Sequence, residues 1–161
     1  MIEIDLSIAS AGWKALGDVE AVEALAREVV EAALAVAGEA QEELSLSLLF
    51  AGDEAVRALN RGFRGKDKPT NVLSFPAPVP PGLPGSRPLG DVVLAFETVA
   101  WEAENEGKTL ADHARHLIVH GTLHLLGYDH ETDAEAERME ALEVEALARL
   151  GIADPYREAA A

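Results

Sequence analysis

The pattern of hydrophobic and polar positions predicts a chain in which strands come early and helices come late. Segments that alternate or are rich in β-branched residues are typical of strands, and they occur at residues 2–8, 44–50, 70–76 and 90–96. Apolar residues at helical spacing occur at residues 19–37, 54–63, 97–105, 109–126 and 134–150. The proline-rich residues 76–90 are expected to form an extended loop.

This order of elements predicts an α+β fold, in which a small mixed sheet of about four strands packs with about five helices. Asp53 precedes the second helix and is expected to cap it. In the last helix, the glutamates are expected to face water, while an apolar stripe packs inward through Met139, Leu142, Ala146 and Leu150.

The composition is that of a single globular domain spanning residues 1–161. With 161 residues and 48% hydrophobic content, the chain is long enough to bury a core. It has no cysteine, which excludes disulfides and thiolate metal sites. The start, MIEIDLSIAS, lacks the basic segment and apolar run of a secretory signal, and no apolar run approaches the roughly 18 residues of a membrane span. We therefore expect a cytoplasmic protein that does not bind membranes.

The charge is strongly acidic except in one short segment. A net charge of −16 disfavours a nucleic-acid partner, because a polyanion is repelled by a surface of like charge. Residues 57–68, however, hold one acidic and five basic residues, for a net charge of +4, and the basic ones are Arg57, Arg61, Arg64, Lys66 and Lys68. We expect an anionic ligand to bind at this basic segment. Taken alone, the segment is more typical of a solvated helix end.

Three histidines in the C-terminal half have the spacing of a metal site. His120 and His124 lie four residues apart, so on a helix they face the same side. Gly127 can end that helix, after which the chain can reverse and bring His130 back as a third ligand. Three nitrogen ligands with an open fourth position are typical of catalytic zinc, and nickel or another divalent ion also suits imidazole. The sequence thus predicts a metal site on a central helix of the fold.

A second interpretation of the histidines is a polar stripe on an exposed helix, to which His113 and His116 also belong. Apolar residues surround His120 and His124, which favours the metal site, because buried imidazoles need partners. On that interpretation, His113 and His116 lie at the surface or behind the metal ligands, and His116 shares the helix face of His120.

Gly121 indicates which kind of bond the site would cleave. The spacing of the histidines and Gly127 matches the metzincin peptidases, in which a glutamate directly after the first histidine acts as the general base. Glycine cannot accept a proton, so a peptidase with this sequence would lack its base. Phosphodiester cleavage depends less on such a base, but it needs a cation on the non-bridging oxygens. Arg64, close to Gly62 and Gly65, is the candidate for that cation.

Together, these motifs resemble the YbeY family of bacterial endoribonucleases, which are also described as rRNA maturation factors. The resemblance covers most of the chain, through LNRGFRGKDKPTNVLSFP at 59–76, LGDVVL at 89–94, HLIVHGTLHLLGYDH at 116–130 and the ending at 135–156. The histidine block and RGKDKPTNVLSF are its most specific parts, and no residue departs from the family at the matched motif positions.

The resemblance implies a metal-bearing helix packed against a small sheet, with one zinc ion per chain at His120, His124 and His130. It also implies a functional arginine at Arg64, in a cleft facing the metal. The implied activity is cleavage of single-stranded RNA in the maturation of the 16S rRNA 3′ end and in ribosome quality control. Ribosomal and ribosome-assembly proteins are the implied partners.

The hypothesis is a zinc-dependent endoribonuclease in which Arg64 stabilises charge on the scissile phosphate. Alternation along a strand would place Ser74 on the face of Val72 and not of Asn71, so not all the polar side chains there could point into one cleft. Asp129 either orients a metal ligand or favours the turn. Further substrate contacts are expected from Arg61, Lys66, Lys68, Thr70, Asn71 and Ser74.

Two alternatives to this hypothesis stay open at this point. One is a metzincin-like metallopeptidase, against which Gly121 counts. The other is a non-catalytic ribosome-assembly module in which zinc only stabilises the fold. The sequence predicts no particular oligomeric state.

Overall fold

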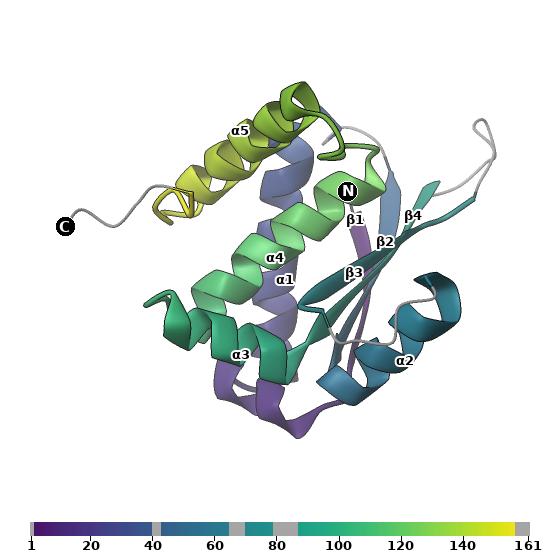
Figure 1. Ribbon diagram of the computed structural model, residues 1–161, viewed down its shortest axis with the longest axis vertical. Helices are drawn as coiled ribbons and strands as arrows, with labels where there is room; N and C mark the ends of the chain where they lie inside the picture. The colour runs from purple at the N-terminus through teal and green to yellow at the C-terminus, as the bar shows by residue number, and fades with distance from the viewer. Residues whose placement is uncertain (1, 40–42, 65–69, 79–86, 157–161) are drawn as a thin grey trace.

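A mixed sheet of four strands forms the centre of the protein (Figure 1). The computed structural model describes residues 2–39, 43–64, 70–78 and 87–156. In spatial order the sheet runs β1-β2-β4-β3, and β3 is antiparallel to its neighbour while the other pairs are parallel. The strands are β1 (Ile2–Ile8), β2 (Leu44–Ala51), β3 (Val72–Pro76) and β4 (Arg87–Ala95). The predicted α+β class is confirmed, although β4 begins inside the segment that was expected to be a loop.

Helices lie on both sides of this sheet (Figure 1). On one side are α1 (Val19–Val36), α3 (Phe96–Asn105), α4 (Leu110–Leu125) and α5 (Asp133–Arg149). On the other side is α2 (Asp53–Arg64). The five predicted helices are confirmed, and a 3-10 helix, η1 (Ala11–Leu16), adds an element that the periodicity did not indicate. Among the described residues, no helix combines the length and apolar character needed to cross a bilayer.

Two hydrophobic clusters hold the layers together. The larger cluster joins the sheet to α1, α4 and α5 and contains the fully buried Val29, Phe50 and Ile118. The smaller cluster joins the sheet to α2 and contains Val56 and Val93. Burying such a side chain stabilises the fold by roughly 1.5–3 kcal/mol. Because α4 carries His120 and His124, the larger cluster also sets the position of the predicted metal ligands.

Caps determine where the two helices around the predicted site begin. The Thr109 hydroxyl accepts a hydrogen bond from the Asp112 backbone N–H (3.0 Å) at the start of α4. In the same way, Thr132 accepts from the Glu135 N–H (3.1 Å) at the start of α5. A cap of this kind stabilises a helix by about 1 kcal/mol.

Asp53 caps a different helix from the one expected. It is the first residue of α2, but its carboxylate accepts hydrogen bonds from the backbone N–H and the hydroxyl of Thr98 in the first turn of α3 (3.0 and 2.9 Å). The Glu97 carboxylate accepts in return from the Asp53 N–H (3.1 Å). The first turns of α2 and α3 are therefore hydrogen-bonded to each other. Capping rules that consider a single helix do not predict such a contact.

Gly121 lies where α4 comes closest to the sheet. A Cβ atom at this position would be 2.8 Å from Val92 Cγ1 on β4 and 3.1 Å from Ser74 Oγ on β3. The Ser74 hydroxyl also donates a hydrogen bond to the Gly121 carbonyl (3.3 Å). The absence of a side chain thus lets α4 pack directly on β3 and β4, and the neighbouring His120 is held beside the same strands.

We predict that Gly121→Ala destabilises the protein by about 1–2 kcal/mol, since the overpacking cost exceeds the helix-propensity gain of up to about 1 kcal/mol. Gly62→Ala is the matched control, because Gly62 is an exposed glycine in α2 and no atom of the described residues lies within 4 Å of the added methyl. The control should leave the stability unchanged or raise it. Chemical denaturation measures both free energies of unfolding, and equal effects of the two substitutions would contradict the close packing.

Candidate metal centre

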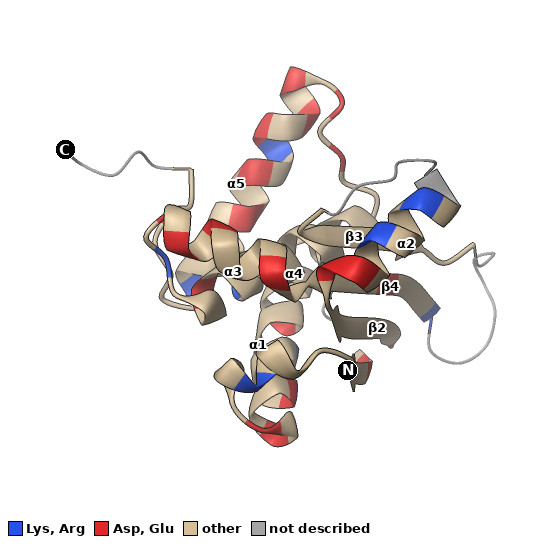
Figure 2. Ribbon diagram, turned by 60° about the horizontal axis from the view of Figure 1, so that its bottom comes forward, with Lys and Arg blue, Asp and Glu red and all other residues tan. Residues whose placement is uncertain are grey.

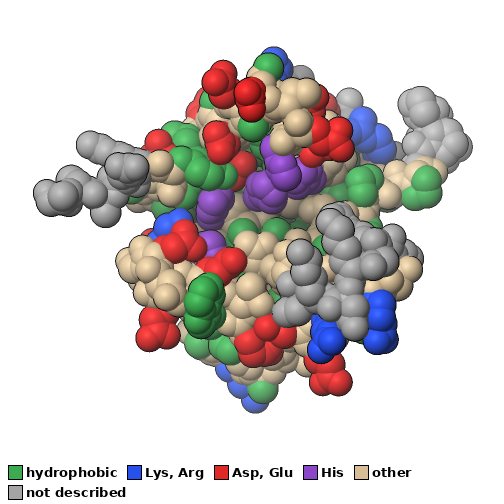
Figure 3. All heavy atoms as spheres, viewed as in Figure 1, with side chains coloured by type: hydrophobic (Ala, Val, Ile, Leu, Met, Phe, Trp, Pro, Cys, Tyr) green, Lys and Arg blue, Asp and Glu red, His purple; other side chains and the backbone are tan. Residues whose placement is uncertain are grey.

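His120, His124 and His130 are brought together at the end of α4. Their candidate ligand nitrogens all lie within 4.8 Å of one another, so the group can hold a metal ion. The Nε2 atoms of His120 and His124 are 3.1 Å apart. Tetrahedral zinc with bonds of 2.0–2.1 Å needs ligand nitrogens about 3.4 Å apart. The spacing of His120 and His124 is close to this value, and His130 lies within reach of both. Figure 3 shows histidine side chains gathered at the surface beside acidic ones.

The turn after α4 brings the third histidine into place. Gly127 has a φ of +102°, a conformation that favours glycine, and it ends the helix. The Tyr128 N–H donates to the Leu123 carbonyl (3.1 Å), which closes the last turn. The Asp129 carboxylate accepts from the His130 N–H (2.8 Å). Of the two roles considered for Asp129, this bond fits the stabilisation of the turn.

The protonation state of His124 suits metal binding. Burial lowers the pKa of His124, and the nearby His120 and His130 lower it further when they are charged. A lowered pKa keeps the imidazole neutral, which is the form that binds a metal.

A cavity of about 580 Å³ opens beside the three histidines. Thr70, Asn71, Val72 and Ser74 line it together with the histidine group. The Asn71 side chain donates a hydrogen bond to Glu102 (2.9 Å), which does not line this cavity, so the expectation that not all the polar side chains point into one cleft stays a prediction. Thr70 and Asn71 come before β3 begins at Val72, so strand alternation does not apply to them.

The basic segment is only partly described. Arg64 is the last residue of α2, and its side chain lies outside the described part of the structure, as do Lys66 and Lys68. Arg61 is exposed on α2 and is not among the residues that line the cavity. In the ribbon of Figure 2, basic residues are marked along α2, whereas the marked residues of α5 are mostly acidic.

Gly121 does not face this cavity, although it follows His120 directly. Its Cα–H bond points at Val92 and Ser74 of the sheet, and a glutamate there would have to enter the packed layer between α4 and β4. The close packing of α4 on the sheet therefore depends on a glycine at the position where the metzincin peptidases carry their glutamate base.

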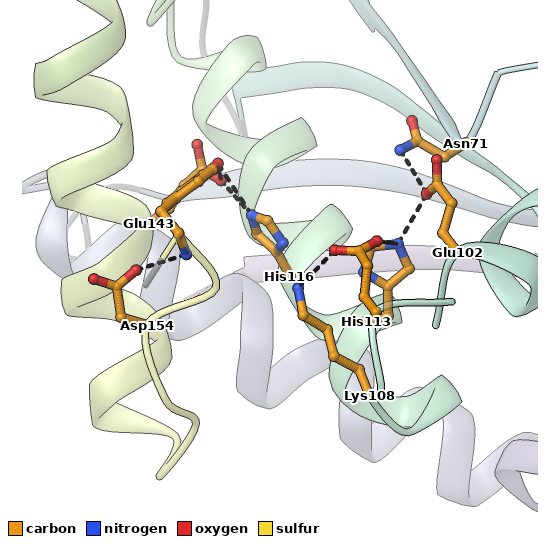
Figure 4. A network of polar contacts seen from close by, with 9 residues as sticks. Asn71, Glu102, Lys108, His113, His116, Glu143 and Asp154 are labelled. Carbon is orange, nitrogen blue, oxygen red and sulfur yellow. Dashed lines mark hydrogen bonds and ion pairs between the residues drawn. The ribbon is translucent and has the colours of Figure 1, made fainter. Parts of the chain in front are cut away.

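Glu143 is buried behind His120, which contradicts the expectation that the glutamates of α5 face water. Only 1% of the residue is exposed. Its Oε1 accepts from His116 Nε2 (2.6 Å) and the Tyr156 hydroxyl (2.7 Å), and its Oε2 accepts from His120 Nδ1 (3.2 Å). Burial alone would raise the pKa of Glu143, but the hydrogen bonds from His116, His120 and Tyr156 outweigh it and lower the pKa to about 2. Figure 4 shows Glu143 reaching from α5 toward His116 on α4.

The sequence did hold a signal for this residue. Glu143 falls four residues after Met139 and three before Ala146, so it lies on the same helical stripe as these buried side chains. A carboxylate on a buried stripe needs partners, and the histidines of α4 supply them.

His113 is also buried, with 3% of the residue exposed, so a surface location is wrong for it. Its Nε2 donates to the Glu102 carboxylate (2.9 Å), which also accepts from the Asn71 side chain (2.9 Å). Glu102, Glu106 and His113 lie close enough to hold an ion, but Glu106 pairs with Lys108 (3.2 Å) and His113 with Glu102. Figure 4 shows this second network beside the first. Within the described residues, the Nδ1 atom of His113 is buried without a hydrogen-bond partner.

Comparison with known proteins identifies close relatives of this chain. A family model described as Endoribonuclease YbeY matches residues 8–151. Proteins named Endoribonuclease YbeY from Chelativorans sp. (strain BNC1) and Paramagnetospirillum magneticum (strain AMB-1) are each 52% identical to it. The matches cover 95% and 98% of this chain and 92% and 97% of those proteins. The solution structure of TM1509 from Thermotoga maritima matches with a TM-score of 0.55 over 98% of this chain and 100% of that one; at 23% identity it shows the fold alone.

We predict that His130→Ala lowers zinc affinity by more than the roughly 10–100-fold that loss of an outer partner costs, because a ligand itself is removed. The melting temperature of the metal-free protein should change little, since His130 is exposed in a turn. His113→Ala should lower the melting temperature of the metal-free protein and change zinc affinity little. His113 is buried and bonded to Glu102, away from the three histidines. Competition with a chromophoric chelator and thermal unfolding measure the two effects. Wild-type zinc affinity in His130→Ala would remove His130 from the ligand set.

Proposed function

The chain belongs to the endoribonuclease YbeY family, and on that premise we propose that it is a metal-dependent endoribonuclease that cleaves single-stranded RNA. The observation that carries the proposal is the group of three histidines beside a polar cavity, in a chain that matches the family over residues 8–151. The whole chain, residues 1–161, would form the one catalytic domain.

We propose zinc as the metal, one ion per chain, held by His120, His124 and His130. Three neutral imidazoles with room for a fourth ligand are the donor set of a catalytic zinc site, and nickel or another divalent ion fits the same donors. When bound, the ion would act as a Lewis acid and would lower the pKa of a water molecule to about 7. Glu143 would hold the proton of His120 on Nδ1, so that the Nε2 lone pair faces the ion.

We propose that Arg64 binds the non-bridging oxygens of the scissile phosphate. A guanidinium group can contact two oxygens at once, and it stabilises charge that grows in the transition state. Arg61, Lys66 and Lys68 would neutralise neighbouring phosphates. Thr70, Asn71 and Ser74 line the cavity and would contact the sugar and base of the bound nucleotide.

The shape of the cavity supports a single-stranded substrate. Formed by the described residues, the cavity has a volume of about 580 Å³, which is on the scale of single nucleotide units. Unpaired RNA can present its backbone and splayed bases to such a cavity, whereas a duplex meets proteins with its outer surface. Cleavage would therefore require an unpaired segment.

We propose a cellular role in rRNA processing, at the 3′ end of 16S rRNA, and in ribosome quality control. The family resemblance supports this role, and with it we propose a cytoplasmic location. The net charge of −16 disfavours tight binding of RNA by the chain alone. Ribosomal and ribosome-assembly proteins would therefore present the substrate, with the basic segment as the local contact.

We predict that Arg64→Ala lowers cleavage of a defined single-stranded RNA by at least about 100-fold, the cost of losing one group that stabilises transition-state charge. Zinc content and melting temperature should stay at wild-type values. The matched control is Arg149→Ala, an exposed arginine on α5 whose pairing partner is Glu145. A double-stranded RNA of the same sequence should resist the wild-type protein.

Each result of this experiment has a distinct meaning. Wild-type activity in Arg64→Ala would remove Arg64 from the mechanism. Failure of zinc-loaded wild-type protein to cleave any single-stranded RNA would favour the non-catalytic, zinc-stabilised assembly module instead.

A further inference from the structure

Glu143 and Tyr156 connect the predicted metal ligands to the C-terminal segment, residues 151–156. After α5, Gly151 adopts a φ of +78° and the chain turns back, with the Ile152 N–H donating to the Leu147 carbonyl (2.9 Å). Tyr156 then reaches Glu143 through its hydroxyl (2.7 Å) and sets its ring edge-on against His116, 5.5 Å between centroids. The segment after the last helix thus returns to the helix that carries the histidines.

The contacts of Glu143 determine which nitrogen of His120 can bind a metal. A neutral imidazole carries its proton on one nitrogen and a lone pair on the other. Glu143 Oε2 accepts from Nδ1, so the lone pair is on Nε2, which faces His124 Nε2 at 3.1 Å. Without an acceptor at Nδ1, His120 would populate the other tautomer and its ring would be free to turn.

Glu143 in turn depends on Tyr156 and His116. A carboxylate with 1% exposure is costly unless its oxygens are bonded. Two of its three hydrogen-bond donors, His116 Nε2 and the Tyr156 hydroxyl, meet at Oε1, which leaves Oε2 for His120. Tyr156 therefore contributes to the position of the oxygen that orients the metal ligand, although it does not touch that ligand.

We propose that Glu143 is the positioning residue of the metal centre and that Tyr156 couples the C-terminal segment to metal affinity through it. This inference rests on the proposed metal site at His120, His124 and His130. Coupling of this kind is reciprocal. Metal binding should therefore stabilise the C-terminal segment, residues 151–156, by the same free energy by which the segment strengthens metal binding. Slower amide hydrogen exchange in residues 151–156 would report that stabilisation.

The experiment uses the full chain, stripped of metal, as wild type, Glu143→Gln, Tyr156→Phe and Glu145→Gln. Glu145→Gln is the matched control, because it makes the same change on the same helix at an exposed residue. The dissociation constant for zinc is measured by competition with a chromophoric chelator. The visible absorption of the cobalt(II)-loaded proteins reports the ligand geometry, and thermal unfolding of the metal-free proteins reports the fold.

We expect Glu143→Gln to weaken zinc binding by about 10–100-fold, as loss of an outer partner of a ligating histidine does. Tyr156→Phe should weaken it by about two- to tenfold, the effect of one hydrogen bond. Both variants should shift the cobalt(II) spectrum. Glu145→Gln should match the wild type in affinity and spectrum.

Wild-type affinity and spectrum in Glu143→Gln and Tyr156→Phe would overturn the inference. If Glu143→Gln does not fold, Tyr156→Phe decides alone, since it removes one hydroxyl from a half-exposed residue and keeps the ring. If the wild type binds no zinc, the metal site of the proposed function fails together with this inference. If the wild type binds zinc but the variants do not differ from it, only the inference fails.

Discussion

The close contact of α4 with the sheet at Gly121 is the constraint on which the candidate site depends. A side chain at this position would strike Val92 and Ser74, so only glycine lets the helix lie this near β3 and β4. The contact holds His120 and His124 at the rim of the cavity that β3 lines on its other side. In the sequence, Gly121 argues against a peptidase because it replaces a base. In the structure the same residue faces the packed sheet, where its lack of a side chain allows the close contact of α4.

Periodicity along the chain was enough to predict the sheet and its helices, because apolar stripes determine which faces are buried. The parts that it missed depend on contacts between elements distant in sequence. Asp53 bonds to Thr98 on another helix, whereas local capping rules predict that it caps its own helix. Glu143 and His113 are buried, although charged and polar residues usually lie at the surface. The spacing of Glu143 within the stripe of Met139 and Ala146 was the one local sign of its burial.

The two sides of the candidate site differ in burial and in the residues that they carry. Behind the histidines, a buried carboxylate with a pKa lowered to about 2 stays charged at neutral pH and holds the proton of His120. In front of them, the cavity is lined by polar residues such as Thr70 and Ser74 and by the acidic Asp129 and Glu131. Glu143, by contrast, is buried and is not among the residues that line the cavity.

Metal-dependent cleavage of RNA is the central claim, and one measurement tests it most directly. Metal-free protein, zinc-reconstituted protein and zinc-loaded His124→Ala are compared on one defined single-stranded RNA, with metal content determined for each sample. The account predicts cleavage by the reconstituted protein alone. Cleavage at the same rate by verified metal-free protein would contradict it.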